Sequence, residues 1–518
     1  MANVTKGKTL DGKPYAGDPH VRLLCNRREF LGVASAFGAA GAAGGAEART
    51  DRAAARDLGP VKLRVGIVSD IHITNDTPGR RDSNEHFIKA LRYFDAQKVD
   101  AVLVAGDLFT TGRIRELEFV AEAWNAVFPH DRAADGRPVA RLFVTGNHDV
   151  EDWTYQLQPG ETAAQKAERV KGEMFAFHRA ETWRRLFGED YAPYGAKTVK
   201  GYTFVLRNWP SAFHGERPAV EAAMAEWGPK VARDKVFFYC QHEQADDTVN
   251  ASWLVGGAKW NNGQDGGLTK RVLSAYPNCV CLTGHSHNSL ADERSIWQGA
   301  YTAVNCGCLV GWAFAGEGRE NGHDCDGNPV PVREMPVFDR THVYQGLLMT
   351  VYADAVRFHR REFVNGGVLG NDWIVPLGTA ARPYAFAPRV AASRPPRFAA
   401  DAQVAVRAVE KGRDRAGDVH PQVEVAFPSV TSATGGDRAH DYAVRVEMMI
   451  GDVVRTVDEK RVFSDRFMWS EADDRAPVRC LFAKRALPAG RLLRFVVTPY
   501  NCWMKPGEPI ATNWKVYT

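Results

Sequence analysis

Residues 63–72 read LRVGIVSDIH, an apolar run that closes on Asp70 and His72. The run is rich in β-branched residues and too short for a core helix, so it predicts a buried strand over residues 62–69. In α/β proteins, ligand sites gather at the carboxyl ends of the parallel strands. The stretch therefore favours an α/β fold with a polar site at one rim of its sheet.

Four further apolar runs end on Asp, Asn or His in the same way. In chain order, DAVLVA, VARLFVT, KVFFYCQ and NCVCLT lead to Gly106-Asp107, Gly146-Asn147-His148-Asp149, His242 and Gly284-His285-Ser286-His287. Residues two apart on an extended strand point the same way, so the Asp-x-His and His-x-His pairs would each form a pincer. The glycines would let the chain turn sharply where strand meets loop.

Each motif alone is weak, because an isolated Gly-Asp is usually a turn and a single histidine is usually packed or solvated. Five motifs in one order, each behind an apolar run, are a stronger signal. They predict seven metal ligands: Asp70, His72, Asp107, Asn147, His242, His285 and His287. Seven ligands are too many for one closed site and suit two adjacent cations, the usual means of hydrolysing phosphate esters.

The segments between the motifs have the lengths and patterns of crossover helices. Residues 83–97 and 114–127 show helical spacing of apolar residues, and strands are predicted over 100–105 and 140–145. This βαβαβ order indicates a parallel core. Residues 151–235 form an insertion, and residues 343–364 and 372–377 are expected to close a second sheet.

The pattern changes after a Pro/Ala-rich stretch at residues 381–397, which is predicted to be a linker. Residues 398–518 contain short segments of alternating apolar and polar residues, such as PQVEVAFPSV and DYAVRVEMMI, separated by Gly, Pro and Asp. This pattern is typical of an all-β sandwich.

With these motifs the chain resembles the calcineurin-like metallophosphoesterases over residues 60–380. The resemblance implies an α/β fold, a four-layer α/β/β/α sandwich, followed here by the smaller all-β domain. The stretch GHSHNSLADERSIWQGAYT also resembles exported bacterial members with a C-terminal β domain. By motif position, the family's first metal would be held by Asp70, His72 and His287. The second would be held by Asn147, His242 and His285, with Asp107 bridging the two.

His148 resembles the family's catalytic histidine. Many members orient that histidine with a second Asp three residues after the bridging one, and here Thr110 occupies that position. Thr110 and the adjacent Asp149 are therefore candidates for the orienting role, and Asp149 has a purely structural alternative. Purple acid phosphatases carry a Tyr ligand at the position of Thr110, so the sequence excludes that subfamily.

The expected function is a dinuclear-metal-dependent phosphodiesterase in which a metal-bridging hydroxide attacks phosphorus. Arg80 and Arg81 follow the first motif and are candidates to bind a phosphate oxygen, with a solvated surface pair as the alternative. The metals would be divalent or trivalent ions, Mn, Fe or Zn, among which the ligand set does not choose. Three other functions stay open: a phosphomonoesterase, a non-catalytic glycan- or cell-wall-binding protein with a vestigial metal site, and a nuclease, which the small net charge disfavours.

The first 48 residues have the pattern of a twin-arginine signal peptide. Arg27 and Arg28 precede the weakly apolar VASAFGAAGAAGG, and Ala46-Glu47-Ala48 offers a cleavage site. We therefore expect a bacterial protein exported by the twin-arginine machinery to the periplasm or the medium. The alternative is a disordered basic leader.

Composition is that of an ordinary globular protein, with 45% hydrophobic and 25% charged residues in 518. This length predicts two domains. The formal net charge of +4 gives no case for a nucleic-acid partner. We expect no transmembrane segment in the mature chain, and the oligomeric state is left open. Eight cysteines follow the leader and permit disulfides, although several lie in apolar strands where free thiols are usual.

Overall fold

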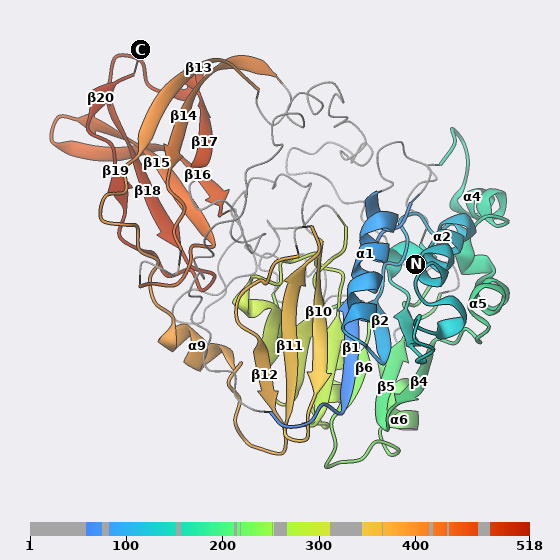
Figure 1. Cartoon of the computed structure of the whole chain (residues 1–518). Coiled ribbons are helices and arrows are strands. Elements are labelled where there is room, and N and C mark those ends of the chain that lie inside the picture. The colour runs from blue at the N-terminus through green and yellow to red at the C-terminus, as the bar shows by residue number, and fades with distance from the viewer. Residues whose placement is uncertain are drawn as a thin grey trace, which may run out of the picture. The chain divides into compact units, whose positions relative to one another are not determined.

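The computed structural model describes residues 58–74, 82–151, 157–211, 215–217, 219–250, 252, 267–310, 344–364, 366–413, 418–431, 435–464 and 477–517. In this part of the chain, two six-stranded sheets share one apolar core and smaller all-β sheets follow (Figure 1). The predicted signal peptide lies outside the described residues.

The first sheet has the strand order β12-β11-β10-β1-β2-β3. Its strands are β1 Leu63–Val68, β2 Ala101–Ala105, β3 Ala140–Val144, β10 Gln345–Val351, β11 Ala355–Glu362 and β12 Trp373–Pro376. Strands β1, β2 and β3 are parallel, whereas β10 runs antiparallel to β1. The three parallel strands are buried along almost their whole length, which is why they are continuous apolar runs in the sequence.

The second sheet has the order β4-β5-β6-β7-β9-β8. Its strands are β4 Tyr194–Val199, β5 Tyr202–Arg207, β6 Phe237–Cys240, β7 Cys279–Thr283, β8 Ile296–Gln298 and β9 Thr302–Asn305. Strands β5, β6, β7 and β9 are parallel. The predicted insertion thus supplies the β4–β5 hairpin at one edge of this sheet, through a tight turn in which Lys200 and Gly201 both have positive φ.

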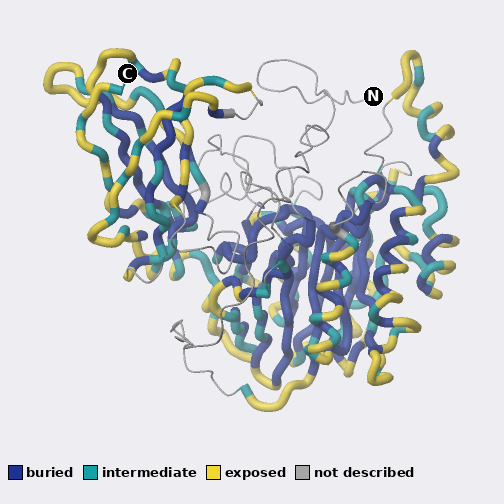
Figure 2. The backbone as a smooth tube through the Cα atoms, turned by 45° about the horizontal axis from the view of Figure 1, so that its top comes forward, coloured by how far each residue is buried: buried dark blue, intermediate teal, exposed yellow. Residues whose placement is uncertain are grey.

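Helices cover the outer face of each sheet, which gives four layers. The helices are α1 Asp82–Ala96, α2 Ile114–Asn125, α3 Asn147–Val150, α4 Ala163–Val170, α5 Arg179–Phe187, α6 Val220–Trp227 and α7 Leu268–Leu273. Residues of α1, α2 and α5 share a core with the first sheet, and residues of α6 and α7 share one with the second. In Figure 2 the buried stretches of the tube run mainly through the strands of the two six-stranded sheets, and the helices and loops around these sheets carry many exposed stretches. The fold is the expected α/β/β/α sandwich.

The C-terminal region contains two further sheets, β13-β14-β17 and β16-β15-β18-β19, with β20 beside β18. Their strands are β13 Ala405–Arg413, β14 Val419–Phe427, β15 Asp441–Ile450, β16 Val453–Phe463, β17 Val478–Ala483, β18 Leu492–Tyr500, β19 Ile510–Ala511 and β20 Lys515–Val516. Both sheets contribute to one apolar core. The predicted linker contains a short helix, α9 Phe386–Ala392. The domain boundaries at residues 381–397 stay a prediction.

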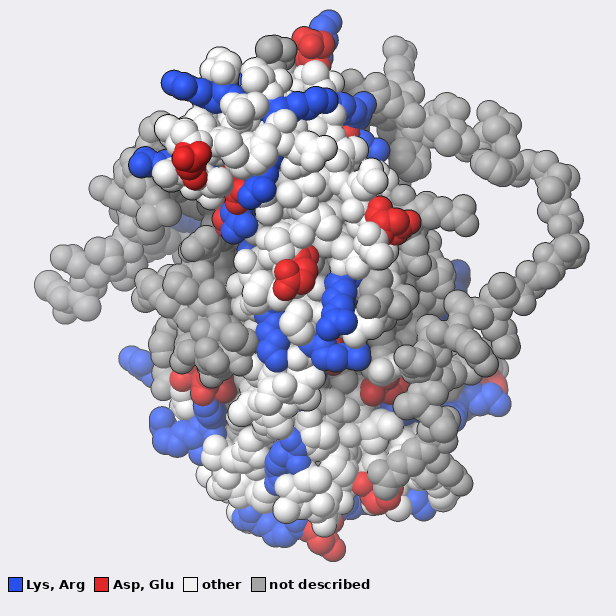
Figure 3. Space-filling model, turned by 90° about the vertical axis from the view of Figure 1, so that its left-hand side faces the viewer, with Lys and Arg blue, Asp and Glu red and all other residues white. Residues whose placement is uncertain are grey.

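Other sequence-based expectations concern cysteines, membranes and charge. All seven described cysteines are free thiols, and Cys325 lies outside the described residues. No helix among the described residues has the length and apolar character needed to cross a membrane. On the face shown in Figure 3, basic and acidic side chains are interspersed with wide uncharged areas.

Candidate metal centre

The predicted ligands lie just beyond the carboxyl ends of five parallel strands, three in the first sheet and two in the second. Asp70 and His72 follow β1, Asp107 follows β2, and Asn147 follows β3. His242 follows β6, and His285 and His287 follow β7. Because both sheets share a core, these strand ends meet at one rim, where the side chains of all seven residues are buried.

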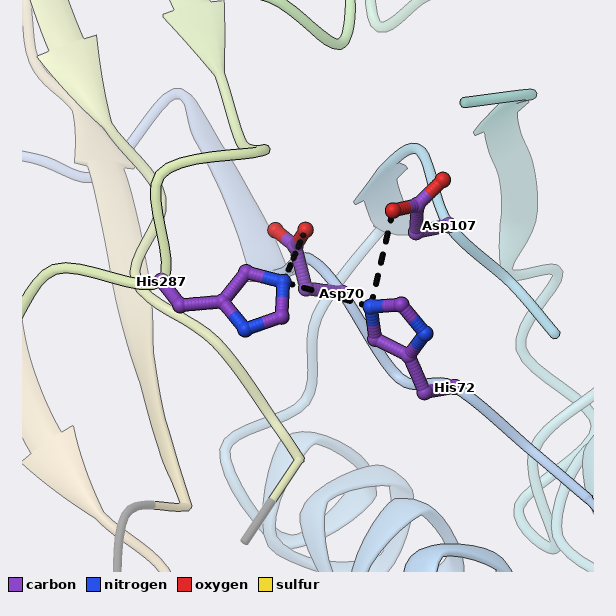
Figure 4. A group of neighbouring side chains, drawn as sticks. All are labelled: Asp70, His72, Asp107 and His287. Carbon is purple, nitrogen blue, oxygen red and sulfur yellow. Dashed lines mark hydrogen bonds and ion pairs between the residues drawn. The ribbon is translucent and has the colours of Figure 1, made fainter. Parts of the chain in front are cut away.

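One group consists of Asp70, His72, Asp107 and His287 (Figure 4). The Nε2 atoms of His72 and His287 are 3.2 Å apart and point toward each other. Asp70 Oδ1 lies 2.9 Å from His287 Nε2, and Asp107 Oδ2 lies 3.5 Å from His72 Nε2. Two ring nitrogens and two carboxylates therefore converge on one point.

The other group consists of Asp107, His242 and His285, so Asp107 belongs to both. Its Oδ2 atom lies 3.1 Å from His242 Nε2, and the rings of His242 and His285 pack edge to face at 4.8 Å. This division is the one that the family resemblance implies. Asn147 is buried beside this group at the start of α3, and its role as a ligand stays a prediction.

The donor set fits two cations. Within each group the possible ligand atoms of the Asp and His side chains lie within 4.8 Å of one another. Burial lowers the pKa of His72 and of His285 well below the usual value, which keeps both imidazoles in the neutral form that binds metals. Burial also disfavours the charged form of His242, but Asp107 and Asp70 outweigh it and raise the pKa of His242 to about 10. The same negative potential would attract a cation.

Five ligand residues have left-handed backbone conformations. The φ angles are 51° for Asp70, 49° for His72, 50° for Asp107, 68° for His285 and 49° for His287. The expected pincers on extended strands are therefore wrong in their geometry, because β1 ends at Val68 and β7 at Thr283. Each pair converges through turns beyond the strand. Strained backbone of this kind concentrates at functional sites.

The glycines of the motifs make room for the ligands. Gly106 has a φ of +95°, as expected for a sharp turn, and a Cβ there would overlap the ring of His242. A Cβ on Gly146 would overlap the carboxylate of Asp107, and one on Gly284 would overlap Ser69. At Gly146 and Gly284, glycine is therefore needed because neighbouring side chains approach the backbone too closely for a Cβ atom.

Backbone groups hold the ligands in place. Nδ1 of His242 lies 2.7 Å from the carbonyl oxygen of Ala105, which can only accept, so Nδ1 carries a hydrogen and Nε2 is the ring nitrogen that faces Asp107 and would bind a metal. The backbone N–H of His285 donates to both oxygens of Asp70, at 2.9 and 3.1 Å. The first sheet thereby fixes a ligand loop of the second sheet.

His148 is half-buried and stands beside His72, with ring centroids 4.6 Å apart. Its backbone N–H donates to Asp107 Oδ1 at 2.9 Å, and its Nδ1 lies 2.7 Å from the carbonyl oxygen of Thr110. Thr110 thus contacts the histidine through its backbone, and its hydroxyl donates to the carbonyl of His72. A carbonyl replaces the carboxylate that many family members use.

Asp149 has a structural position. Its carboxylate accepts from the backbone N–H groups of Leu108, Phe109 and Gly146, at 3.2, 3.0 and 2.7 Å. These bonds tie the loop after β2 to the loop after β3, and so hold Asp107 against His148. Asp149 therefore positions the two loops through their backbone. The group that contacts the ring of His148 is the Thr110 carbonyl.

Three residues that support the site have no signal in the sequence motifs. Trp209 is buried, with its ring centroid 5.7 Å from that of His242, and its Nε1 donates to Glu151 at 3.2 Å. Burial raises the pKa of Glu151 to about 7. Glu116 accepts from the N–H and the hydroxyl of Thr111, both at 2.8 Å, and so fixes the turn that presents the Thr110 carbonyl. The candidates Arg80 and Arg81 lie outside the described residues.

Comparison with known proteins agrees with this geometry. Residues 63–289 match the model of the family described as calcineurin-like phosphoesterase. No curated protein matches the chain.

Several solved structures are similar to the chain. A dimetal phosphatase from Danio rerio shares 12% identity over 62% of this chain and 100% of its own, with a TM-score of 0.35. Purple acid phosphatase PPD1 from yellow lupin shares 12% identity over 61% of this chain and 53% of its own, with a TM-score of 0.34. The phosphoesterase Yfce from E. coli shares 11% identity over 60% and 100%, with a TM-score of 0.24.

The assignment rests on the family match and on the ligand geometry, because the structural likenesses are distant. Residues 63–289 form a calcineurin-like phosphoesterase domain, and the protein is a metal-dependent phosphoesterase.

Proposed function

We propose that the protein hydrolyses phosphodiesters at a centre of two metal ions. The observation that carries the dinuclear centre is the position of Asp107, whose carboxylate belongs to both buried ligand groups. Its Oδ2 atom faces a histidine of each group, at 3.5 Å from His72 Nε2 and 3.1 Å from His242 Nε2. Bound there, the cations would activate water for attack on phosphorus and neutralise charge on the phosphoryl oxygens.

The protein's own residues would orient the substrate and handle the proton of the leaving group. The Thr110 carbonyl accepts from Nδ1 of His148, so Nε2 would be the ring atom that exchanges a proton. We assign His148 the role of protonating the leaving alkoxide. The bond from its backbone N–H to Asp107 keeps the histidine beside the ligands.

The preference for diesters is supported by the Gly146-Asn147-His148-Asp149 motif, which is common in the phosphodiesterase branches of the family that the chain resembles. The alternative within the same chemistry is a phosphomonoesterase. The two differ in whether the substrate carries one or two ester groups on phosphorus.

We also propose export of the folded enzyme by the twin-arginine route. The support is the Arg27-Arg28 pair and the apolar stretch that follows it. That route carries folded proteins, which suits an enzyme whose metal ligands come from distant parts of the chain and are assembled only by folding.

The first prediction concerns metals and substrate class. Chelation should abolish hydrolysis, and adding back Mn, Fe or Zn should restore it. Nitrophenyl diesters should be turned over faster than the matched monoester. Metal content by elemental analysis should approach two ions per chain. Activity that survives complete metal removal would contradict the proposal, and faster monoester turnover would favour the phosphomonoesterase.

The second prediction concerns the bridge. Asp107→Asn should lose bound metal and at least about 100-fold in turnover, because a neutral amide stabilises two cations poorly. Elemental analysis and diester hydrolysis measure the two effects. Asp135→Asn, the same change at an exposed residue, is the control. Normal metal content together with normal turnover would remove Asp107 from the centre.

The third prediction concerns the acid. His148→Ala should keep its metals and lose roughly 100-fold or more in kcat on an alkyl diester, where the leaving group needs a proton. The loss should be much smaller on a nitrophenyl diester. His130→Asn, at an exposed histidine, should behave as the native protein does. An equal loss on both substrates would show that His148 is not the acid.

The fourth prediction concerns export. Replacing Arg27 and Arg28 together by Lys should retain folded, active precursor in the cytoplasm of a host with an intact twin-arginine pathway. Lys lacks the planar guanidinium fork of Arg. Cell fractionation and activity in each fraction give the answer, with mature native protein in the periplasm or the medium as the control. Unchanged export of the Lys-Lys variant would refute this assignment.

A further inference from the structure

The segment that directly follows the ligand motif Gly284–His287 is deeply buried. Residues 288–292, 294 and 295 expose 3% of their surface or less. Two of them, Asp292 and Arg294, form an ion pair with Nη2–Oδ2 and Nε–Oδ1 distances of 2.6 and 2.9 Å. A buried ion pair is stable only when further hydrogen bonds satisfy its remaining polar atoms.

The C-terminal sheets supply such contacts. Nε2 of His440 lies 3.4 Å from Arg294 Nη2 and 3.7 Å from Asp292 Oδ2. Its Nδ1 lies 2.7 Å from Oδ2 of Asp441, the first residue of β15. Asp441 also accepts from Arg461 on β16. His440 thus joins the ion pair of one region to the charges of the other.

Two more contacts hold the same segment. The guanidinium of Arg438 donates to the carbonyl oxygen of Ala291. Glu293 lies 2.9 Å from Arg389 of α9 and 2.8 Å from Arg360 of β11. The segment is therefore fixed from the C-terminal sheets, from α9 and from the first sheet.

Buried hydrogen bonds continue from this ion pair to the ligands. The backbone N–H of Asn250 donates to the carbonyl oxygen of Arg294 at 3.1 Å. The side-chain amide of Asn305 donates to Asn250 Oδ1 at 3.2 Å and to Ser286 Oγ at 2.8 Å. Ser286 stands between the ligands His285 and His287 in the chain. Arg294, Asn250, Asn305 and Ser286 are fully buried, so the path does not touch solvent.

We infer that the C-terminal sheets are a positioning element of the metal centre. They hold the loop that carries His285 and His287 through the path His440, Arg294, Asn250, Asn305 and Ser286. This inference rests on the proposed function in one respect, the assignment of both histidines as ligands. Groups that orient metal ligands from behind commonly change metal affinity 10–100-fold when they are removed. If the C-terminal sheets were an independent binding module, they would not need a buried network of charged side chains shared with the segment after the ligand motif.

The test uses the full-length protein with His440→Ala. Its affinity for Mn²⁺ is measured by competition with a chelator, and hydrogen exchange of residues 285–295 is measured on the metal-free protein. We expect at least a tenfold loss of Mn²⁺ affinity and faster exchange in that segment. His420→Ala makes the same chemical change on β14, away from the path, and should stay within about twofold of native in both measurements.

A double-mutant cycle tests the path itself. Asn250→Ala interrupts it on the other side of Arg294. If the contacts act in series, the His440→Ala/Asn250→Ala double variant should lose no more affinity than the weaker-binding single variant. Losses that multiply would show two independent effects and overturn the path.

A folded His440→Ala variant with native affinity and native exchange would overturn the inference. If that variant does not fold, His440→Leu, which fills part of the same space without polar atoms, takes its place under the same criteria. Native protein that binds no Mn²⁺ or other added metal would refute the proposed function instead. In that case the exchange measurement on metal-free protein would still decide whether His440 holds the segment.

Discussion

Holding two carboxylates and four imidazoles together in a buried space is the constraint on which the structure depends. Five of these residues are in left-handed conformations, at about 1–2 kcal/mol each, or roughly 5–10 kcal/mol together. That is comparable with the net stability of an ordinary domain, about 5–15 kcal/mol. Such a site persists only where its surroundings fix both backbone and side chains. Here the surroundings are the apolar core between the two sheets and the cores between each sheet and its helices.

The carboxylates serve the scaffold and the centre at once. Asp70 accepts the backbone N–H of His285, which joins the two sheets at the rim. Asp107 accepts the backbone N–H of His148 while its other oxygen faces the imidazoles. Asp149 accepts three backbone N–H groups and ties the loops after β2 and β3 together. Backbone amides thus offset part of the cost of burying these carboxylates, and the negative charge of Asp70 and Asp107 would remain available to cations.

Sequence patterns predicted the sheets and the ligand types because both leave a direct mark on the chain. Buried parallel strands are continuous apolar runs, and ligands must be Asp, Asn or His just beyond them. The patterns did not predict the turn geometry of Asp70 and His72, since strand alternation stops at Val68. They also missed Glu116 and Glu151. A supporting residue is defined by what it touches in space, and nothing in its local sequence marks it.

The contact between His148 and Thr110 shows where such prediction ends. Thr110 stands where a carboxylate was expected, which suggests that the orienting group is lost. The backbone carbonyl of Thr110 nevertheless contacts Nδ1 of His148. Every residue has a carbonyl, so no side-chain pattern reports its use. A carbonyl sets the tautomer and orientation of the ring as a carboxylate does, but it adds no negative charge. The orientation then depends on the turn itself, which Glu116 holds through Thr111. In this protein the buried carboxylate of Glu116 therefore still affects the orientation of His148, because it holds the turn whose carbonyl contacts the ring.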